Sequence, residues 1–143
     1  MRLIHPKKQQ GKKIVVIVGA GFAGLNAAKA LSMYPDLYVI LLDQKNHHLF
    51  QPLLYQVATA GLNPGDIAVP IRSQFSGNDN VEVHLGKITK VNLETQDIEG
   101  LLENRQVPYD YLILACGACD NYFAHPEWEQ YAQIGRASCR ERV

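Results

Sequence analysis

The strongest constraint on the fold is a strand–turn–helix–strand pattern near the N-terminus. Residues 13–18 (KIVVIV) form a β-branched run typical of a strand that is buried on both faces. The glycine loop GAGFAG at 19–24 follows at once, and the alanine-rich stretch 25–33 predicts a helix. A second apolar run at 37–42 stops at Asp43. The pattern predicts a βαβ unit, the start of an α/β fold with a parallel sheet.

The glycine loop predicts a dinucleotide site because each glycine has a physical role there. Gly19 allows the tight turn, Gly21 lets the backbone approach a pyrophosphate, and Gly24 lets the helix pack closely on the sheet. The helix N-terminus adds N–H groups and a partial positive charge for the phosphates. Asp43 follows Gly24 by nineteen residues, a spacing that suits an acid accepting ribose hydroxyls. The motif leaves both FAD and NAD open, and a tight turn without a ligand is the structural alternative.

The rest of the chain predicts further short elements. The patterns favour a short helix over 66–75, a strand over 81–85, alternation over 87–93, a polar hairpin over 95–107 and a buried strand over 109–115. The segment 47–62 (HHLFQPLLYQVATAGL) differs from these. It is apolar and lacks Asp, Glu, Lys and Arg, yet it fits neither a helical period nor a strand alternation.

Composition excludes several classes of protein. The formal net charge is zero, which argues against nucleic acid as a partner. No apolar run approaches the ~20 residues of a membrane-spanning helix, and we identify no signal peptide. Three cysteines do not indicate a secreted disulfide scaffold, so we expect a cytoplasmic compartment. The basic residues in 1–12 predict a flexible, solvated N-terminus, with a weak attraction to an anionic surface as the alternative.

The last ten residues, IGRASCRERV, match one translated frame of a common sequencing-library adapter. We therefore expect 134–143 to be a non-native tail and exclude Cys139 from any site. A natural polar helix is the alternative. On this interpretation, 13–133 are the N-terminal part of a truncated FAD/NAD(P)-binding domain from a longer protein.

Several of these motifs together resemble type II NADH:quinone oxidoreductases, single-subunit flavoproteins with two dinucleotide-binding domains. The resemblance is carried by IVVIVGAGFAGLNAAKAL, LLDQKNHHLFQPLLYQVATAGL, PGDIAVPIRS, VEVHLGKITKVNLE and YDYLILACGA. It implies an incomplete Rossmann-like FAD-binding domain with a β-meander insertion, to which 81–85 and the following hairpin would belong. It also implies that FAD occupies the glycine loop and that NADH binds a second domain outside this chain.

The implied activity is hydride transfer from NADH to FAD, followed by reduction of a membrane quinone. The expected location is cytoplasmic, peripheral on the inner face of the cell membrane, with C-terminal amphipathic helices outside this chain at the membrane surface. A homodimer is a further expectation. The fragment alone is expected to be inactive and poorly soluble.

The resemblance also assigns cofactor-binding residues position by position, but no catalytic acid or base and no metal ligand. His47 and His48 are interpreted as hydrogen-bonding residues rather than proton donors. The assigned residues are Gly19, Ala20, Gly21, Phe22, Ala23 and Gly24 for the pyrophosphate, Asp43 for the adenosine ribose, Gln44, Lys45 and His48 beside the cofactor, Gln51 and Pro52 on the path to the flavin, Ile88 at the adenine edge, and Ala115 and Gly117 on the return to the flavin.

One departure from the family pattern is Cys116, where the family usually has Thr in an A-T-G-A tetrapeptide. The resulting C-G-A-C at 116–119 leaves a redox dithiol and a zinc site as alternatives to a coincidental pair. Another FAD-dependent reductase of the superfamily is an alternative function, although 24–33 contains no cysteine pair. A nucleotide-binding module without catalysis is a third, but it does not explain 47–62.

Overall fold

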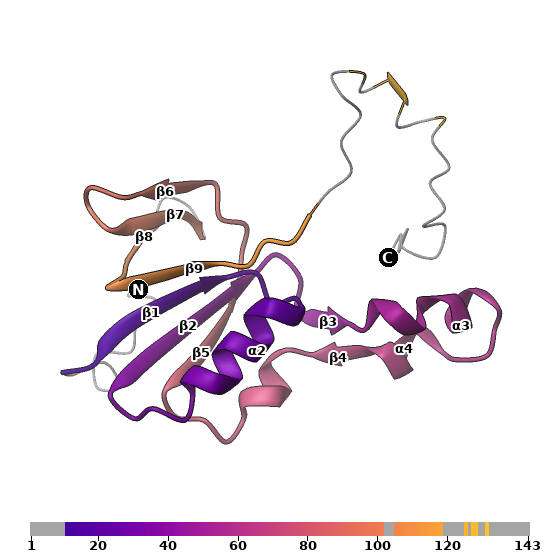
Figure 1. Cartoon of the computed structure of the whole chain (residues 1–143), viewed down its shortest axis with the longest axis horizontal. Coiled ribbons are helices and arrows are strands. Elements are labelled where there is room, and N and C mark those ends of the chain that lie inside the picture. The colour runs from indigo at the N-terminus through magenta and orange to yellow at the C-terminus, as the bar shows by residue number, and fades with distance from the viewer. Residues whose placement is uncertain (1–10, 102–104, 119–124, 126, 129–130, 132–143) are drawn as a thin grey trace. The chain divides into compact units, whose positions relative to one another are not determined.

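The computed structural model describes residues 11–101, 105–118, 125, 127, 128 and 131 (Figure 1). The chain divides into two compact units, each described by itself. The first contains Met1–His48 and Pro70–Gly117, and the second contains Leu49–Val69 and Ala118–Val143. The expected tail over 134–143, Cys119 and most of the basic N-terminus lie outside the described residues. Among the helices that are described, none combines the length and apolarity needed to cross a membrane.

The first unit is built on a four-stranded parallel sheet with the order β5-β2-β1-β9. Its strands are β1 (Lys13–Val18), β2 (Leu37–Asp43), β5 (Val81–Leu85) and β9 (Tyr111–Leu114). Helix α2 (Phe22–Leu31) joins β1 to β2, as Figure 1 shows. The βαβ unit expected from the sequence is therefore confirmed, with the helix beginning inside the glycine loop.

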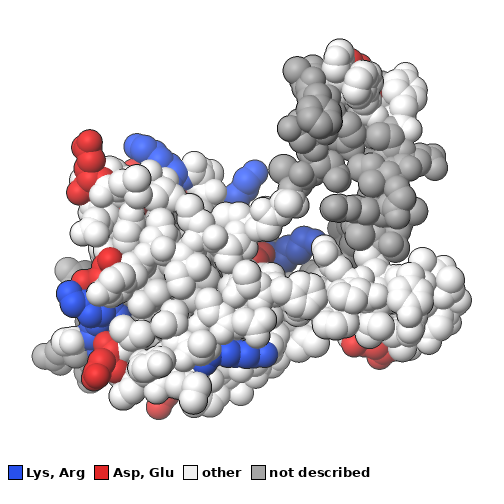
Figure 2. All heavy atoms as spheres, viewed as in Figure 1, with Lys and Arg blue, Asp and Glu red and all other residues white. Residues whose placement is uncertain are grey.

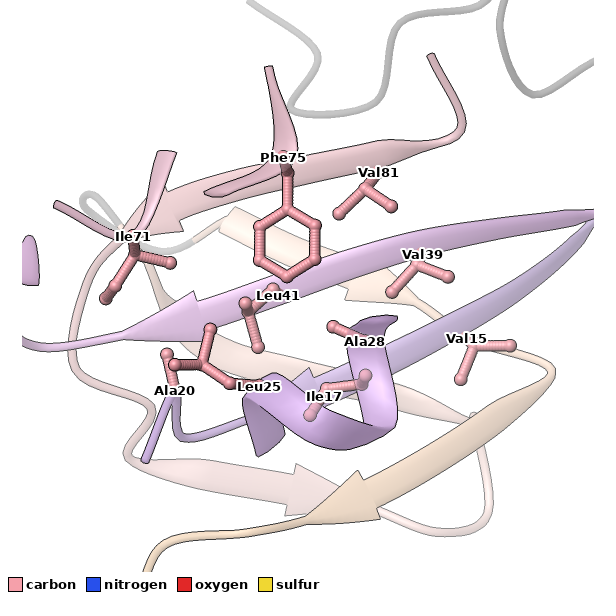
Figure 3. Close-up of a cluster of buried hydrophobic side chains, with 10 residues drawn as sticks. All are labelled: Val15, Ile17, Ala20, Leu25, Ala28, Val39, Leu41, Ile71, Phe75 and Val81. Carbon is pink, nitrogen blue, oxygen red and sulfur yellow. The ribbon is translucent and has the colours of Figure 1, made fainter. Parts of the chain in front are cut away.

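Alternating side chains of the central strands build a core on each face of the sheet. On the α2 side, Val15 and Ile17 pack with Leu25 and Ala28 of the helix and with Phe75 (Figure 3). The opposite face buries a second group, which consists of Ile14, Val16, Tyr38, Ile40, Leu42, Ile98, Val107 and Tyr109. Burial on both faces explains why 13–18 is uniformly apolar rather than alternating.

A separate three-stranded antiparallel sheet supplies part of that second core. Its strands are β6 (Lys90–Asn92), β7 (Asp97–Leu101) and β8 (Arg105–Pro108). The polar hairpin expected over 95–107 is thus confirmed. The assignment of 81–85 to the meander was wrong, because Val81 pairs in parallel with Val39 of β2 and belongs to the main sheet.

Two other expectations are corrected. The predicted helix over 66–75 is three elements: α4 (Pro64–Ile67), β4 (Ala68–Pro70) and the 3-10 turn η2 (Arg72–Phe75). Pro70 explains the break, because proline lacks an N–H and disfavours helical backbone at the residue before it. The strand predicted over 109–115 is not buried, since β9 lies at the sheet edge with Tyr111 58% exposed and Leu114 63% exposed.

The unusual segment 47–62 forms three short elements: β3 (His47–Leu49), the 3-10 turn η1 (Gln51–Leu53) and α3 (Leu54–Ala58). This mixture explains why neither period fitted. Asp66 is the only charged side chain over 49–69, and Figure 2 shows this part of the surface as largely uncharged. Phe50, Tyr55 and Val69 are exposed on it.

Candidate functional site

The glycine loop between β1 and α2 has two positions where no side chain fits. Gly19 has a positive φ of 101°, and a Cβ there would lie 2.3 Å from the carbonyl oxygen of Ala115. A Cβ on Gly24 would lie 1.7 Å from the carbonyl oxygen of Gly19. The steric role expected for Gly19 in the turn is confirmed. Gly24, expected to let the helix pack on the sheet, lets α2 approach the loop at Gly19.

Gly21 differs because the space beside it is open. It is exposed, and a Cβ added there would meet nothing within 4 Å. It is also the N-cap of α2, and no side chain caps the helix there. The first N–H groups of an α-helix have no acceptor within the helix. A loop with open backbone at an uncapped helix N-terminus fits a pyrophosphate.

Asp43 at the end of β2 is bonded to this loop. Its Oδ2 accepts the N–H of Ala20 at 2.6 Å, and its Oδ1 accepts the N–H of Lys45 at 2.8 Å. A carboxylate has about four lone-pair positions, so acceptor capacity remains for ribose hydroxyls. The Asp43 side chain therefore both holds the loop and retains the chemistry expected of a ribose-binding acid.

His48 contacts the same loop at Ala20 and Phe22. Its Nδ1 lies 3.2 Å from the carbonyl oxygen of Ala20, and its ring meets the ring of Phe22 edge-on at 4.9 Å between centroids. Gln44 and Lys45 are exposed beside Asp43. Of the residues predicted around the loop, Asp43 and His48 are thus hydrogen-bonded to it. Asp43 bonds the backbone N–H of Ala20, and His48 bonds its carbonyl oxygen.

A cleft of about 180 Å³ opens beside the loop, at the carboxyl ends of all four parallel strands. Ligands of open parallel sheets bind at this edge. Four predicted residues share the cleft: Gly19, Asp43, Gln44 and Ile88. The lining residues that we did not predict are Val18, Leu42, Gly86, Lys87 and Cys116.

Gly86 and Lys87 had a usable signal in the sequence, because they directly follow the strand 81–85. The error was to place that strand in the meander. Once it pairs with β2, its carboxyl end must lie beside Asp43, and the Gly86 N–H indeed donates to the Asp43 carbonyl oxygen at 2.8 Å. Lys87 is thereby one of the residues that line the cleft, and it is the cationic one among them.

The remaining predicted residues lie in two places. Ala115 packs against the loop, with its carbonyl beside Gly19, and Gly117 follows with a positive φ of 73°. Gln51 and Pro52 belong to η1 in the second unit, so their contact with a cofactor stays a prediction.

Cys116 is exposed, and its Sγ lies 3.8 Å from the carbonyl oxygen of Val18. Cys119, its partner in the redox alternative, lies outside the described residues, so the structure does not test the expected coincidental pair against a dithiol. Over the described ranges, no three His, Cys, Asp or Glu side chains gather in a way that would hold a metal ion.

Comparison with known proteins identifies the class. The family model for pyridine nucleotide-disulphide oxidoreductases matches residues 13–141, so the chain belongs to that family. The type II NADH:quinone oxidoreductase Ndh of Mycobacterium tuberculosis is 46% identical over 120 residues, which cover 82% of this chain and 26% of the relative. The type II NADH:quinone oxidoreductase of Haemophilus influenzae is 31% identical, covering 78% of this chain and 28% of the relative.

A solved structure supports the same assignment. NDH2 from Plasmodium falciparum in complex with NADH superposes with a TM-score of 0.71 at 27% identity, over 83% of this chain and 25% of that chain. The resemblance to type II NADH:quinone oxidoreductases is therefore confirmed. The chain spans about a quarter of the length of these relatives.

Proposed function

We propose that this chain is the FAD-binding first part of a type II NADH:quinone oxidoreductase, which oxidises NADH and reduces a membrane quinone. One observation carries the proposal. The open turn at Gly21 lies at the carboxyl edge of the sheet, and Asp43 is bonded to the adjoining Ala20 N–H. Relatives that align over this same region are named for that activity.

The residues of the loop and the cleft would each hold a part of the cofactor. Residues 19–24 would take the pyrophosphate and Asp43 the adenosine ribose, while the backbone at Ile88 would border the adenine. Lys87 lines the same cleft beside Ile88 and would add a positive charge for an anionic ligand there. When bound, FAD accepts a hydride and passes on two electrons, while the protein positions it.

The other partners of the whole protein follow from the same assignment. NADH would bind in a second nucleotide-binding domain outside this chain. Quinone reduction places the protein at a membrane, and we propose a peripheral position on the inner face of the cell membrane. A homodimer is the proposed assembly. No residue described here is assigned as a catalytic acid or base.

The test is expression of the full-length protein that contains this sequence. Its flavin is released by denaturation and identified by mass, and NADH oxidation is followed with a water-soluble short-chain quinone as acceptor. We expect one FAD per chain and quinone-dependent NADH oxidation. A protein that binds no FAD, or that reduces a disulfide or ferredoxin but not the quinone, would contradict the proposal.

A further inference from the structure

Ala20 is held by side chains on both of its backbone polar groups. It is buried, with 2% of its surface exposed, and it stands between Gly19 and Gly21 in the loop. Its N–H donates to Asp43 Oδ2 at 2.6 Å, and its carbonyl oxygen lies 3.2 Å from His48 Nδ1. Because a carbonyl only accepts, the Nδ1 of His48 must carry the proton and donate.

The direction of the Gly21 N–H depends on this second bond. The carbonyl of Ala20 and the N–H of Gly21 belong to one planar trans peptide unit, in which they point in opposite directions. A side chain that bonds the Ala20 carbonyl oxygen therefore directs the Gly21 N–H to the opposite side of this peptide unit. Gly21 is exposed and a Cβ there would meet nothing within 4 Å, so an incoming phosphate can approach the backbone of this residue.

The neighbouring peptide unit is fixed as well. The N–H of Ala20 is bonded to Asp43, while the carbonyl oxygen of Gly19 in the same unit faces Gly24 of α2. Without the His48 bond, the unit between Ala20 and Gly21 would be the freer of the two, since Gly21 allows a wide range of backbone angles. The Phe22 ring, packed edge-on against the imidazole, helps to keep His48 in place.

We infer that His48 is a positioning residue for the cofactor: through the Ala20 carbonyl it presets the Gly21 N–H for the FAD pyrophosphate. This inference rests on the proposed function. It differs from a direct contact between His48 and the cofactor, because the imidazole acts through the backbone of the loop. Pre-orienting a donor raises affinity by removing an ordering cost from the binding step.

Three substitutions in the full-length protein separate this role from simple packing. In His48→Asn the side-chain amide nitrogen stands where Nδ1 was, whereas in His48→Gln it reaches the position of Nε2. His48→Phe keeps a ring against Phe22 and removes the donor. FAD affinity is measured by titrating the flavin-free proteins and following the quenching of flavin fluorescence, and thermal unfolding of the same preparations reports on the fold.

We expect His48→Asn to bind FAD within twofold of the wild type, and His48→Gln and His48→Phe to bind about threefold to tenfold more weakly, the range of one net hydrogen bond. Equal affinity of the Asn and Gln variants would overturn the inference, as would wild-type affinity of the Phe variant. If His48→Phe does not fold, the comparison of Asn with Gln decides. A wild-type protein that binds no FAD would instead contradict the proposed function.

Discussion

Gly24→Ala tests the steric argument for the glycine loop most directly. The added Cβ would lie 1.7 Å from the carbonyl oxygen of Gly19 and 3.4 Å from the Cβ of Ala115. Helix and loop would have to separate by about 1.7 Å or more to restore an ordinary contact. The loop cannot yield freely, because the Gly19 N–H donates to the Leu42 carbonyl oxygen at 2.7 Å and Gly19 itself has a positive φ.

The expected cost is near the upper end of the range for overpacked sites, about 3 kcal/mol. The better helix propensity of alanine offsets about 1 kcal/mol, which leaves a net loss of about 2 kcal/mol. For a domain of 150–250 residues this lowers the melting temperature by about 4–8 °C. The assay is thermal unfolding of the flavin-free full-length protein, followed by circular dichroism.

Two other glycines provide matched controls. Gly21→Ala should leave the melting temperature of the flavin-free protein unchanged, because its Cβ meets nothing within 4 Å, yet it should weaken FAD binding by filling the space of the pyrophosphate. Gly77→Ala has equally open surroundings away from the loop and should change neither quantity. A Gly24→Ala protein as stable as the wild type would refute the steric reasoning.

Three further predictions concern the cleft and the first strand. Asp43→Asn should weaken FAD binding at least tenfold, since the amide carries no charge and keeps one acceptor oxygen for the Ala20 N–H, the Lys45 N–H and the ribose, whereas the exposed Asp36→Asn should bind normally. FAD should slow alkylation of the exposed Cys116, measured by peptide mass spectrometry; equal rates with and without FAD would place the cofactor elsewhere. The Lys13 ammonium, with the Ile14 N–H, lowers the pKa of Asp110, so this carboxylate stabilises the fold above its unfolded pKa and the contribution is lost as pH falls through the lowered value. The melting temperature of Asp110→Asn should therefore lie below that of the wild type at pH 7, with the gap closing below about pH 4; a constant gap would contradict this.

Much of the first unit was predictable because its signals are local. The βαβ unit over 13–43 follows from uninterrupted apolar strands, the glycine spacing and the acid at the end of the second strand. The steric roles of Gly19 and Gly24 followed from the same motif. The hairpin after 95 was also predicted, since its polar residues lie between strands that pair with their sequence neighbours.

Other features were missed because their causes are not local. The pattern of 81–85 is compatible with a parallel or an antiparallel neighbour, and only the pairing of Val81 with Val39 decides between them. The apolar residues of β9 suggested burial, but its place at the sheet edge leaves Leu114 exposed. Pro70 is itself a local signal for a break in the helix. Our prediction gave more weight to the helical spacing of the apolar residues around it.

By itself, the sequence determined the strand–glycine loop–helix–strand order and the chemistry offered at its turn, because backbone sterics and burial periodicity act over a few residues. Only the tertiary structure decided which strand ends share the cleft, and so brought Lys87 and Cys116 beside Asp43. It also decided that His48 reaches the carbonyl of Ala20, twenty-eight positions away in the chain. Such contacts depend on which strands pair and on the course of the loops that follow them. Both are set by the free energy of the whole fold rather than by the local sequence.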